Sequence, residues 1–314
     1  MISLSKALFA ITAIAVIAPI GVADVPPQEP VNGPYLGQPE PGDTPVQFAP
    51  DLISTEGIQH CFPAFSPDGL ELYWTTFDME GERPRPEIWF MKATDSGWSK
   101  PQVAPFSGQY SDHNPVFSHD GSRLYFASRR PGALESKGCL WYLERTDDGW
   151  SDPKPLGSPP NTELSATQPT FTTNGNLYFV CSFPNVKWNR TIYRCEKSDS
   201  GYTAPIALPP PVRTEDANVY PYIAPDESFL LFGSTRPGGS STETDLYFSH
   251  RNEDGSWEQP IHLDSTINDG FSVSFPFVTH DGKYLFFNRF DSTGSDRFFW
   301  VNASILQKYR STDN

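Results

Sequence analysis

Residues 62–69 read Phe-Pro-Ala-Phe-Ser-Pro-Asp-Gly, and this stretch decides the fold of the 314-residue chain because it recurs four times. The copies are Asn114–Gly121, Gln168–Gly175, Tyr220–Glu227 and Phe275–Gly282. Their prolines stand at positions 63, 115, 169, 221 and 276, so the spacings are 52, 54, 52 and 55 residues. A period held this closely predicts a repeat architecture.

Each copy begins a unit of four short predicted strands. Pro starts the first strand, where its missing N–H costs least, and Asp-Gly or Asn-Gly supplies positive φ angles for a two-residue hairpin turn. Apolar second strands follow at 72–74, 124–126, 177–179, 230–232 and 285–287, and third strands at 88–90, 140–142, 192–194, 246–248 and 298–300. In four units a Gly and an aromatic residue then close a turn. A Pro three residues after the aromatic, at 101, 153, 205 and 260, suits an edge strand.

Four strands in about 53 residues make one blade of a β-propeller, because such a sheet buries both aromatic faces only between neighbouring blades. The fifth unit lacks its fourth strand. Residues 46–50 resemble residues 102–106, so the N-terminal segment is expected to complete the last blade. The sequence therefore predicts an all-β, five-bladed propeller over residues 46–301. Six blades are the alternative and would need a cryptic blade, while an extended β-solenoid leaves the complementary ends unexplained.

Composition and charge agree with this fold and exclude some partners. Pro and Gly supply 55 of 314 residues, aromatic residues 14% and charged residues 19%, which nearly excludes long helices. The formal charge of −15 argues against a nucleic-acid partner and against an anionic membrane surface.

The first 23 residues have the features of an export signal. Lys6 precedes an apolar run that reaches about Ile20, and Gly-Val-Ala at 21–23 forms a small-residue cleavage site. A membrane helix is the competing interpretation, but the run is short and contains Pro19. We expect a periplasmic or secreted mature chain without membrane insertion, with residues 24–45 as an extended arm or linker and residues 302–314 as a tail. Loss of Lys6 changes its charge to 22 − 38 = −16.

Three segments carry the repeat pattern most clearly. They are Phe65-Ser66-Pro67-Asp68-Gly69, Ser128-Arg129-Arg130-Pro131-Gly132 and Ser234-Thr235-Arg236-Pro237-Gly238. This pattern resembles the Pro-Asp class of WD-like repeats in TolB-type β-propellers of exported bacterial proteins, over residues 46–301. Departures occur in units three to five, such as Glu227 where Gly is usual. The resemblance implies the fold and, in most members, binding of a protein or ligand. Some similar propellers are carbohydrate lyases or peptidase domains.

The Asp-Gly turns and the Gly-aromatic turns belong to one end of the propeller, which we call the turn end. The opposite, irregular end holds the starts of the first strands and the loops after the second strands, and we expect the binding site there. The candidate residues are His60, Asp112, His113, Gln168 and Tyr220 before the first strands, and Arg129, Arg130, Trp188, Arg236 and Arg289 in the loops. His119 and His280, in the Asp-Gly turns, are expected at the surface.

These candidates have structural as well as functional interpretations. The arginines suit a carboxylate or sugar-acid clamp, but Arg before Pro-Gly is favoured to pair with a neighbouring blade's Asp, such as Asp245. Trp188 is either a stacking platform or a plug against a blade edge. The candidate metal ligands are His60, Asp112, His113 and Gln168. They differ in register and include no paired-His motif, so no metal is expected.

The four cysteines leave the disulfide state open. Strand pairing would place Cys195 opposite about residue 177, too far from Cys181 for a bond. Cys139 and Cys181 are the candidate pair, and four free thiols are the alternative.

No motif for a serine nucleophile, a phosphate loop or a Cys-x-x-Cys centre occurs, so no cofactor is expected. A catalytic acid pair cannot be selected among 38 Asp and Glu residues without distances. The sequence favours a monomeric binding or scaffold module for a protein or carbohydrate ligand. A carbohydrate-active hydrolase or lyase with its site at the central opening is the alternative.

Overall fold

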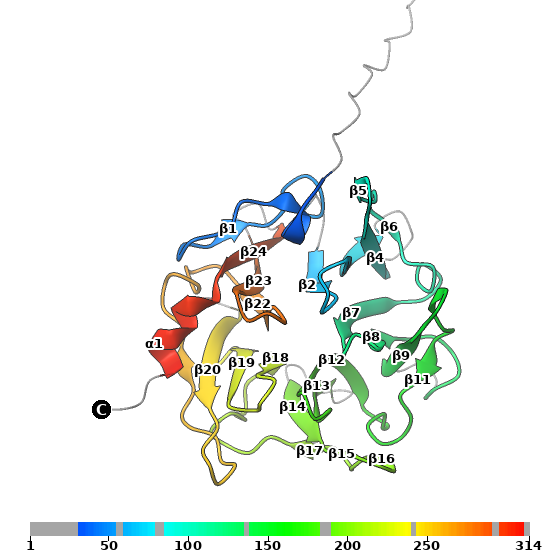
Figure 1. Cartoon of the computed structure of the whole chain (residues 1–314). Coiled ribbons are helices and arrows are strands. Elements are labelled where there is room, and N and C mark those ends of the chain that lie inside the picture. The colour runs from blue at the N-terminus through cyan, green and yellow to red at the C-terminus, as the bar shows by residue number, and fades with distance from the viewer. Residues whose placement is uncertain are drawn as a thin grey trace, which may run out of the picture.

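The computed structural model describes residues 31–54, 59–78, 85–134, 138–182, 190–239, 243–290 and 295–310. Five small antiparallel sheets surround one axis as the blades of a β-propeller (Figure 1). The predicted five-bladed architecture is confirmed, and the described residues form no sixth blade.

Each blade has a long inner hairpin, a third strand and a fourth strand of only two residues. Blade 1 contains β2 (Gln59–Phe65), β3 (Glu71–Asp78), β4 (Arg85–Thr94), β5 (Gly97–Trp98) and β6 (Gln102–Val103). Blade 2 contains β7 (Asp112–Phe117), β8 (Arg123–Ser128), β9 (Cys139–Thr146), β10 (Gly149–Trp150) and β11 (Lys154–Pro155). Blade 3 contains β12 (Ser165–Phe171), β13 (Leu177–Ser182), β14 (Arg190–Cys195) and β17 (Ile206–Ala207), with the hairpin β15 (Lys197–Ser198) and β16 (Gly201–Tyr202) beside it.

The last two blades are built in the same way. Blade 4 contains β18 (Asn218–Ile223), β19 (Phe229–Ser234), β20 (Asp245–His250) and β21 (Ile261–His262). Blade 5 contains β22 (Val273–Val278), β23 (Tyr284–Phe290), β24 (Asp296–Asn302) and β1 (Val46–Gln47).

The N-terminal strand closes the last blade, as the sequence predicts. Val46 pairs with Trp300 and Gln47 with Phe299, so β1 is the fourth strand of blade 5. The ring is thereby closed by hydrogen bonds between segments about 250 residues apart.

The Asp-Gly turns differ in detail from the predicted two-residue turn. Only the Gly has a positive φ, for example 72° at Gly69, while Asp68 accepts a hydrogen bond from Leu70 N at 3.0 Å. The Asp therefore caps a wider turn rather than sharing the left-handed conformation.

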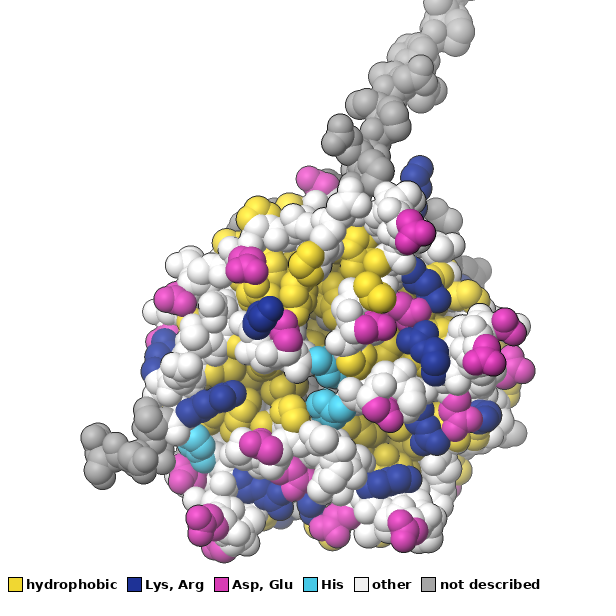
Figure 2. Space-filling model, in the orientation of Figure 1, with side chains coloured by type: hydrophobic (Ala, Val, Ile, Leu, Met, Phe, Trp, Pro, Cys, Tyr) yellow, Lys and Arg dark blue, Asp and Glu magenta, His cyan; other side chains and the backbone are white. Residues whose placement is uncertain are grey.

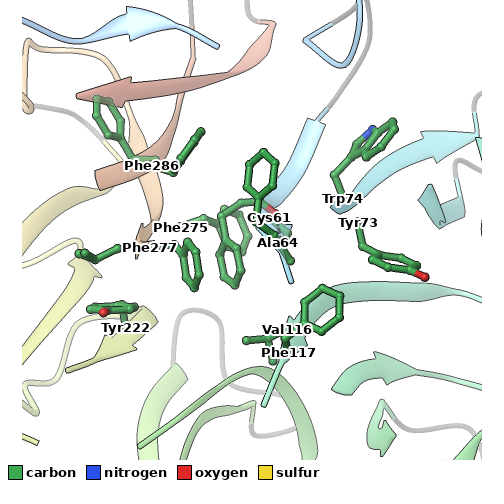
Figure 3. Close-up of a cluster of buried hydrophobic side chains, with 14 of the residues drawn as sticks. Cys61, Ala64, Tyr73, Trp74, Val116, Phe117, Tyr222, Phe275, Phe277 and Phe286 are labelled. Atoms are coloured by element: carbon green, nitrogen blue, oxygen red, sulfur yellow. Dashed lines mark hydrogen bonds between the residues drawn. The ribbon is translucent and has the colours of Figure 1, made fainter. Parts of the chain in front are cut away.

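Aromatic side chains fill the central channel. Phe62 stacks on Phe277 with ring centroids 4.4 Å apart, and Figure 3 shows Phe275 and Phe277 pointing into the space between the blades. At the turn end, the rings of His119 and His280 are 5.3 Å apart. Figure 2 shows two His side chains side by side near the centre of the face. Both side chains are half-buried, so they are partly at the surface as expected, and they also line a cavity of about 20 Å³.

The part of the arm within residues 31–45 packs on the seam between blades 5 and 1. Its 3₁₀ helix η1 (Pro34–Gly37) buries Leu36 and places the Tyr35 ring 5.0 Å from Phe65 and 4.9 Å from Tyr284. The indole N–H of Trp98 donates to Gly33 O at 3.0 Å. The arm therefore forms a second contact across the seam, in addition to β1.

The C-terminal residues also pack on the propeller. The 3₁₀ helix η2 (Ala303–Leu306) continues into the helix α1 (Gln307–Arg310), where Leu306 and Tyr309 are buried. The Tyr309 hydroxyl accepts a hydrogen bond from Asp264 N at 2.9 Å, and the Arg310 guanidinium lies over the Phe229 ring. Within the described residues, no helix has the length and apolar character to cross a membrane.

Candidate functional site

The innermost strand of every blade is interrupted by a β-bulge next to its repeated Pro. The register of each inner hairpin shifts at this point. One residue at each bulge has a positive φ: Cys61, Asn114, Gln168, Tyr220 and Phe275. Bulges redirect side chains, and backbone strain of this kind is found at functional sites. The five bulges around the axis therefore mark a candidate location for a functional site.

Two of the predicted arginines are held inside their own blades. Arg130 donates to the carboxylate of Asp112 at 2.9 Å, and its side chain is 8% exposed. Arg236 donates to Asn218 Oδ1 at 3.0 Å and to Val212 O at 2.8 Å. The favoured structural interpretation placed the partner in a neighbouring blade, but the two side-chain partners, Asp112 and Asn218, lie on the first strand of the same blade.

Asp245 has a different partner from the one expected. Its carboxylate is 2.9 Å from His262 Nε2 on the fourth strand of blade 4. The other predicted arginines are Arg129, which is exposed, and Arg289, whose guanidinium contacts Asp269 at 2.6 Å and covers the Phe299 ring at 3.9 Å. Of the four predicted arginines, three have side chains bonded within the protein. Only Arg129 would therefore be available for an arginine clamp at the irregular end.

The candidate metal ligands have other bonds. The buried carboxylate of Asp112 accepts from Ser128, Ser107 and Arg130. Gln168 Oε1 accepts from Tyr220 N at 2.9 Å, and His113 Nδ1 lies 2.6 Å from Asn114 Oδ1.

Burial lowers the pKa of His113, which keeps its imidazole neutral. The backbone of His60 pairs with that of Thr75, but the His60 side chain is not among the described parts of the structure. Trp188 lies entirely outside the described residues. The described part of the chain contains no group of three His, Cys, Asp or Glu residues that could hold a metal.

The candidate disulfide is not formed, because all four cysteines are free and buried. Leu177 pairs with Cys195, as the sequence predicts, which separates Cys195 from Cys181 along the hairpin. Burial raises the pKa of Cys181 to about 12, and a thiol that stays protonated does not readily enter disulfide chemistry.

Asp296 is a functional candidate that sequence reasoning missed. It is the first residue of β24, it is 2% exposed, and Asn288 Nδ2 donates to its Oδ2 at 3.2 Å. Its other oxygen, Oδ1, is buried without a hydrogen-bond partner in the structure. Burial raises the pKa of Asp296 to about 7, and the hydrogen bond from Asn288 and the charge of Arg297 offset only part of this effect.

Charged groups from three blades act on Tyr220, and Asp296 is one of them. Burial raises the pKa of Tyr220 to about 12, while the charge of Arg190 on blade 3 lowers it and the charges of Asp296 and Glu243 raise it. The Tyr220 ring lies 4.1 Å from Phe275, next to Ser274 on the innermost strand of blade 5. Tyr220, Ser274, Asn288 and Asp296 form what we call the channel-end cluster, with Arg190 and Glu243 at its edge.

The cluster contains unused hydrogen-bonding capacity at the irregular end. Ser274 Oγ, like Asp296 Oδ1, is buried and has no partner in the structure. Ser274 on β22 pairs in register with Asn288 on β23, and β23 also pairs with β24, so one strand separates the two strands that carry the orphan atoms. Unsatisfied buried polar atoms cost stability, and proteins keep them where a ligand, a water molecule or chemistry uses them.

One sequence signal points to Asp296. Thr244-Asp245 and Ser295-Asp296 both begin a third strand, so the hydroxyl-Asp pair recurs in units four and five. The two aspartates differ in their surroundings, because His262 contacts Asp245 while Asp296 has no basic side chain at ion-pair distance among the described residues.

No protein-family model and no curated protein matches this sequence. Solved structures match its shape. The catalytic domain of a GH62 alpha-L-arabinofuranosidase from Coprinopsis cinerea has a TM-score of 0.51 at 12% identity, over 82% of this chain and 97% of that chain. An alpha-L-arabinofuranosidase from Lactobacillus brevis has a TM-score of 0.46 at 16% identity, over 70% of this chain and 79% of that one.

A longer protein matches over part of its length. A puromycin-hydrolyzing peptidase of Mycobacterium tuberculosis has a TM-score of 0.42 at 14% identity, over 68% of this chain and 32% of that chain. This chain therefore spans about a third of the peptidase. At 12% identity, the likeness to the Coprinopsis cinerea domain concerns the propeller fold alone.

Proposed function

We propose that this protein is a carbohydrate-active hydrolase whose site is the channel-end cluster, with Asp296 as the general acid. The observation that carries the proposal is the buried carboxyl group of Asp296, whose pKa of about 7 keeps a proton available near neutral pH. Glycoside hydrolysis needs such an acid to protonate the leaving oxygen, together with a second carboxylate.

The proposed reaction needs only side chains of this protein and one water molecule. Asp296 gives its proton to the glycosidic oxygen as the bond to the anomeric carbon breaks, and water adds to that carbon. Glu243, an exposed carboxylate on blade 4, accepts the proton of this water. Asn288 holds the Asp296 carboxyl through its 3.2 Å hydrogen bond and thereby orients the acid.

Two further observations favour an enzyme over a recognition surface at the irregular end. A recognition surface would be expected to present a ring of available arginines, but Arg130, Arg236 and Arg289 are bonded within the protein. In addition, a buried acid with a raised pKa costs the fold stability, and groups of this kind cluster at functional sites.

The substrate class is part of the proposal. The Coprinopsis cinerea domain of the same fold is an arabinofuranosidase by name, and we carry over from it only the class, a glycoside. We also propose that the chain is an exported monomer whose repeats are of the TolB-type Pro-Asp class, as the signal segment and repeat motifs suggest.

A direct test measures sugar release from arabinan, arabinoxylan and 4-nitrophenyl glycosides by the wild-type protein and by Asp296→Asn. Loss of a general acid is expected to lower kcat by about 100-fold to 10,000-fold and to remove the decline in activity above about pH 7. Asp245→Asn is the matched control, because Asp245 also begins a third strand and is also 2% exposed, and it should retain activity.

The Glu243→Gln variant tests the second carboxylate and should lower kcat in the same assay. Equal activity of Asp296→Asn and the wild type, or no release from any substrate by the wild type, would refute the proposed function.

A further inference from the structure

The turn end carries an open groove between blades 2 and 3. The channel-end cluster lies at the opposite end of the propeller, so the proposed reaction does not use this groove. It has a volume of about 580 Å³, which is within the usual range for small-ligand sites. Asp120, Arg123 and Tyr125 of blade 2 line one side, and Asn174, Lys197 and Tyr202 of blade 3 line the other. We call this the blade 2–3 groove.

The interface between blades 1 and 2 has a different pair of residues at the equivalent positions. Between blades 1 and 2, Glu71 forms a bidentate ion pair with Arg145, in which both N···O distances are 3.0 Å. Strand register places Arg123 where blade 1 has Glu71, and Lys197 where blade 2 has Arg145. A carboxylate–guanidinium pair is therefore replaced by two cations in the blade 2–3 groove.

The charges of these cations are only partly satisfied. Arg123 contacts Glu144 at 2.9 Å, but the other oxygen of Glu144 binds Lys154 at 2.6 Å, so one carboxylate serves two cations. The Lys197 ammonium lies 4.8 Å from the centroid of the Tyr202 ring and forms no ion pair within the described residues. The groove is locally cationic although the chain has a net charge of −15.

The one carboxylate in the groove has other bonds. Asp120 accepts from Ser118 at 2.6 Å and from Ser122 at 2.8 Å, and these hydrogen bonds lower its pKa to about 2. Its oxygens cap the turn of blade 2 and do not neutralise Lys197.

The rest of the lining suits a sugar better than a bare inorganic anion. The rings of Tyr125 and Phe171 are 4.1 Å apart and form a buried aromatic base, and the half-buried Tyr202 is the more accessible aromatic residue of the lining. Hydroxyl and amide groups of Ser122, Thr173 and Asn174 surround this aromatic base. Aromatic rings pack against the C–H faces of a sugar, and hydroxyl and amide groups hydrogen-bond its hydroxyls.

We propose that the blade 2–3 groove binds an acidic oligosaccharide, with a uronic-acid carboxylate between Arg123 and Lys197. The Arg fork and the Lys ammonium both favour a carboxylate, and the aromatic base holds the sugar ring that carries it. This site is independent of the proposed hydrolase site and lies at the opposite end of the propeller.

The test is isothermal titration calorimetry of the full-length mature protein with trigalacturonic acid. Lys197→Met is expected to weaken binding about tenfold or more, the effect of losing one charge-assisted hydrogen bond, and added salt should weaken wild-type binding. Lys283→Met is the matched control, because Lys283 is also an exposed lysine in a turn-end loop, and it should bind like the wild type.

The methyl-esterified trisaccharide keeps the size and hydroxyls but lacks the charge, so it should bind more weakly than the acid. Asp296→Asn should bind the acid as tightly as the wild type, which separates this site from the proposed active site. The proposal is overturned if trigalacturonic acid does not bind, if Lys197→Met binds it normally, if the ester binds equally well, or if Asp296→Asn abolishes binding.

Discussion

Replacement of Asp296 by Asn is expected to stabilise the protein at high pH. The pKa of this carboxyl is about 7 in the folded protein and 3.8 as the ordinary value, so the folded state holds its proton more tightly than the unfolded state. Stability from this group is therefore fully present below about pH 3.8 and is lost as the pH rises through about 7. The two pKa values differ by about 3 units, which corresponds to about 4 kcal/mol.

The Asn side chain has the same shape and no charge, so it avoids this loss. The free energy of unfolding of Asp296→Asn should exceed that of the wild type by about 4 kcal/mol at about pH 8, and by about 1 kcal/mol at about pH 4.5. Urea unfolding followed by tryptophan fluorescence at both pH values measures the difference. Asp245→Asn removes the contact with His262 and should not reproduce this gain.

The outcome that refutes the reasoning is a pH-independent difference between Asp296→Asn and the wild type. It would mean that Asp296 titrates in the folded protein as it does in the unfolded chain. The buried, partly unpaired carboxyl group would then not be a proton donor near neutral pH, and the proposed acid would lose its physical basis.

Two further predictions concern the packing of the fold. Leu36→Ala should lower the free energy of unfolding by about 3 kcal/mol because Leu36 is 1% exposed, whereas Leu70→Ala, at a 54% exposed position, should change it by less than about 0.5 kcal/mol. Equal effects in urea unfolding would show that the arm is not bound in solution. Arg130→Met should cost about 3–5 kcal/mol because it leaves the Asp112 carboxylate buried without its cation, and Arg129→Met should be nearly neutral. Comparable melting temperatures for the two arginine variants would contradict this assignment.

The repeat made most of the fold predictable from sequence. Strand-starting prolines and apolar second strands are local signals that recur, and the similarity of residues 46–50 to residues 102–106 predicts the closing strand. The packing of the arm was not predictable in this way. Tyr35 reaches Tyr284 across about 250 residues of sequence, and no local period encodes such a contact.

The candidate site was less predictable because its chemistry depends on burial and partners. The pattern correctly marks Arg130 as a residue that needs an acidic partner, but only the bulged strand of its own blade shows that the partner is Asp112. Asp296 resembles the other acids in the sequence, and its raised pKa arises from desolvation that only the folded chain reveals. The sequence names Tyr220 as a binding candidate at the irregular end, but it does not indicate the charged groups that act on Tyr220, which come from distant segments.

The closure of blade 5 imposes an order on how the protein is made. β1 is among the first structured segments to leave the ribosome, but its partner β24 is not synthesised until about 250 residues later. The first four blades can form as they appear, while Val46 and Gln47 have no strand to pair with until β24 has been synthesised. A chain that stops before Asp296 therefore cannot close its ring through this strand pair.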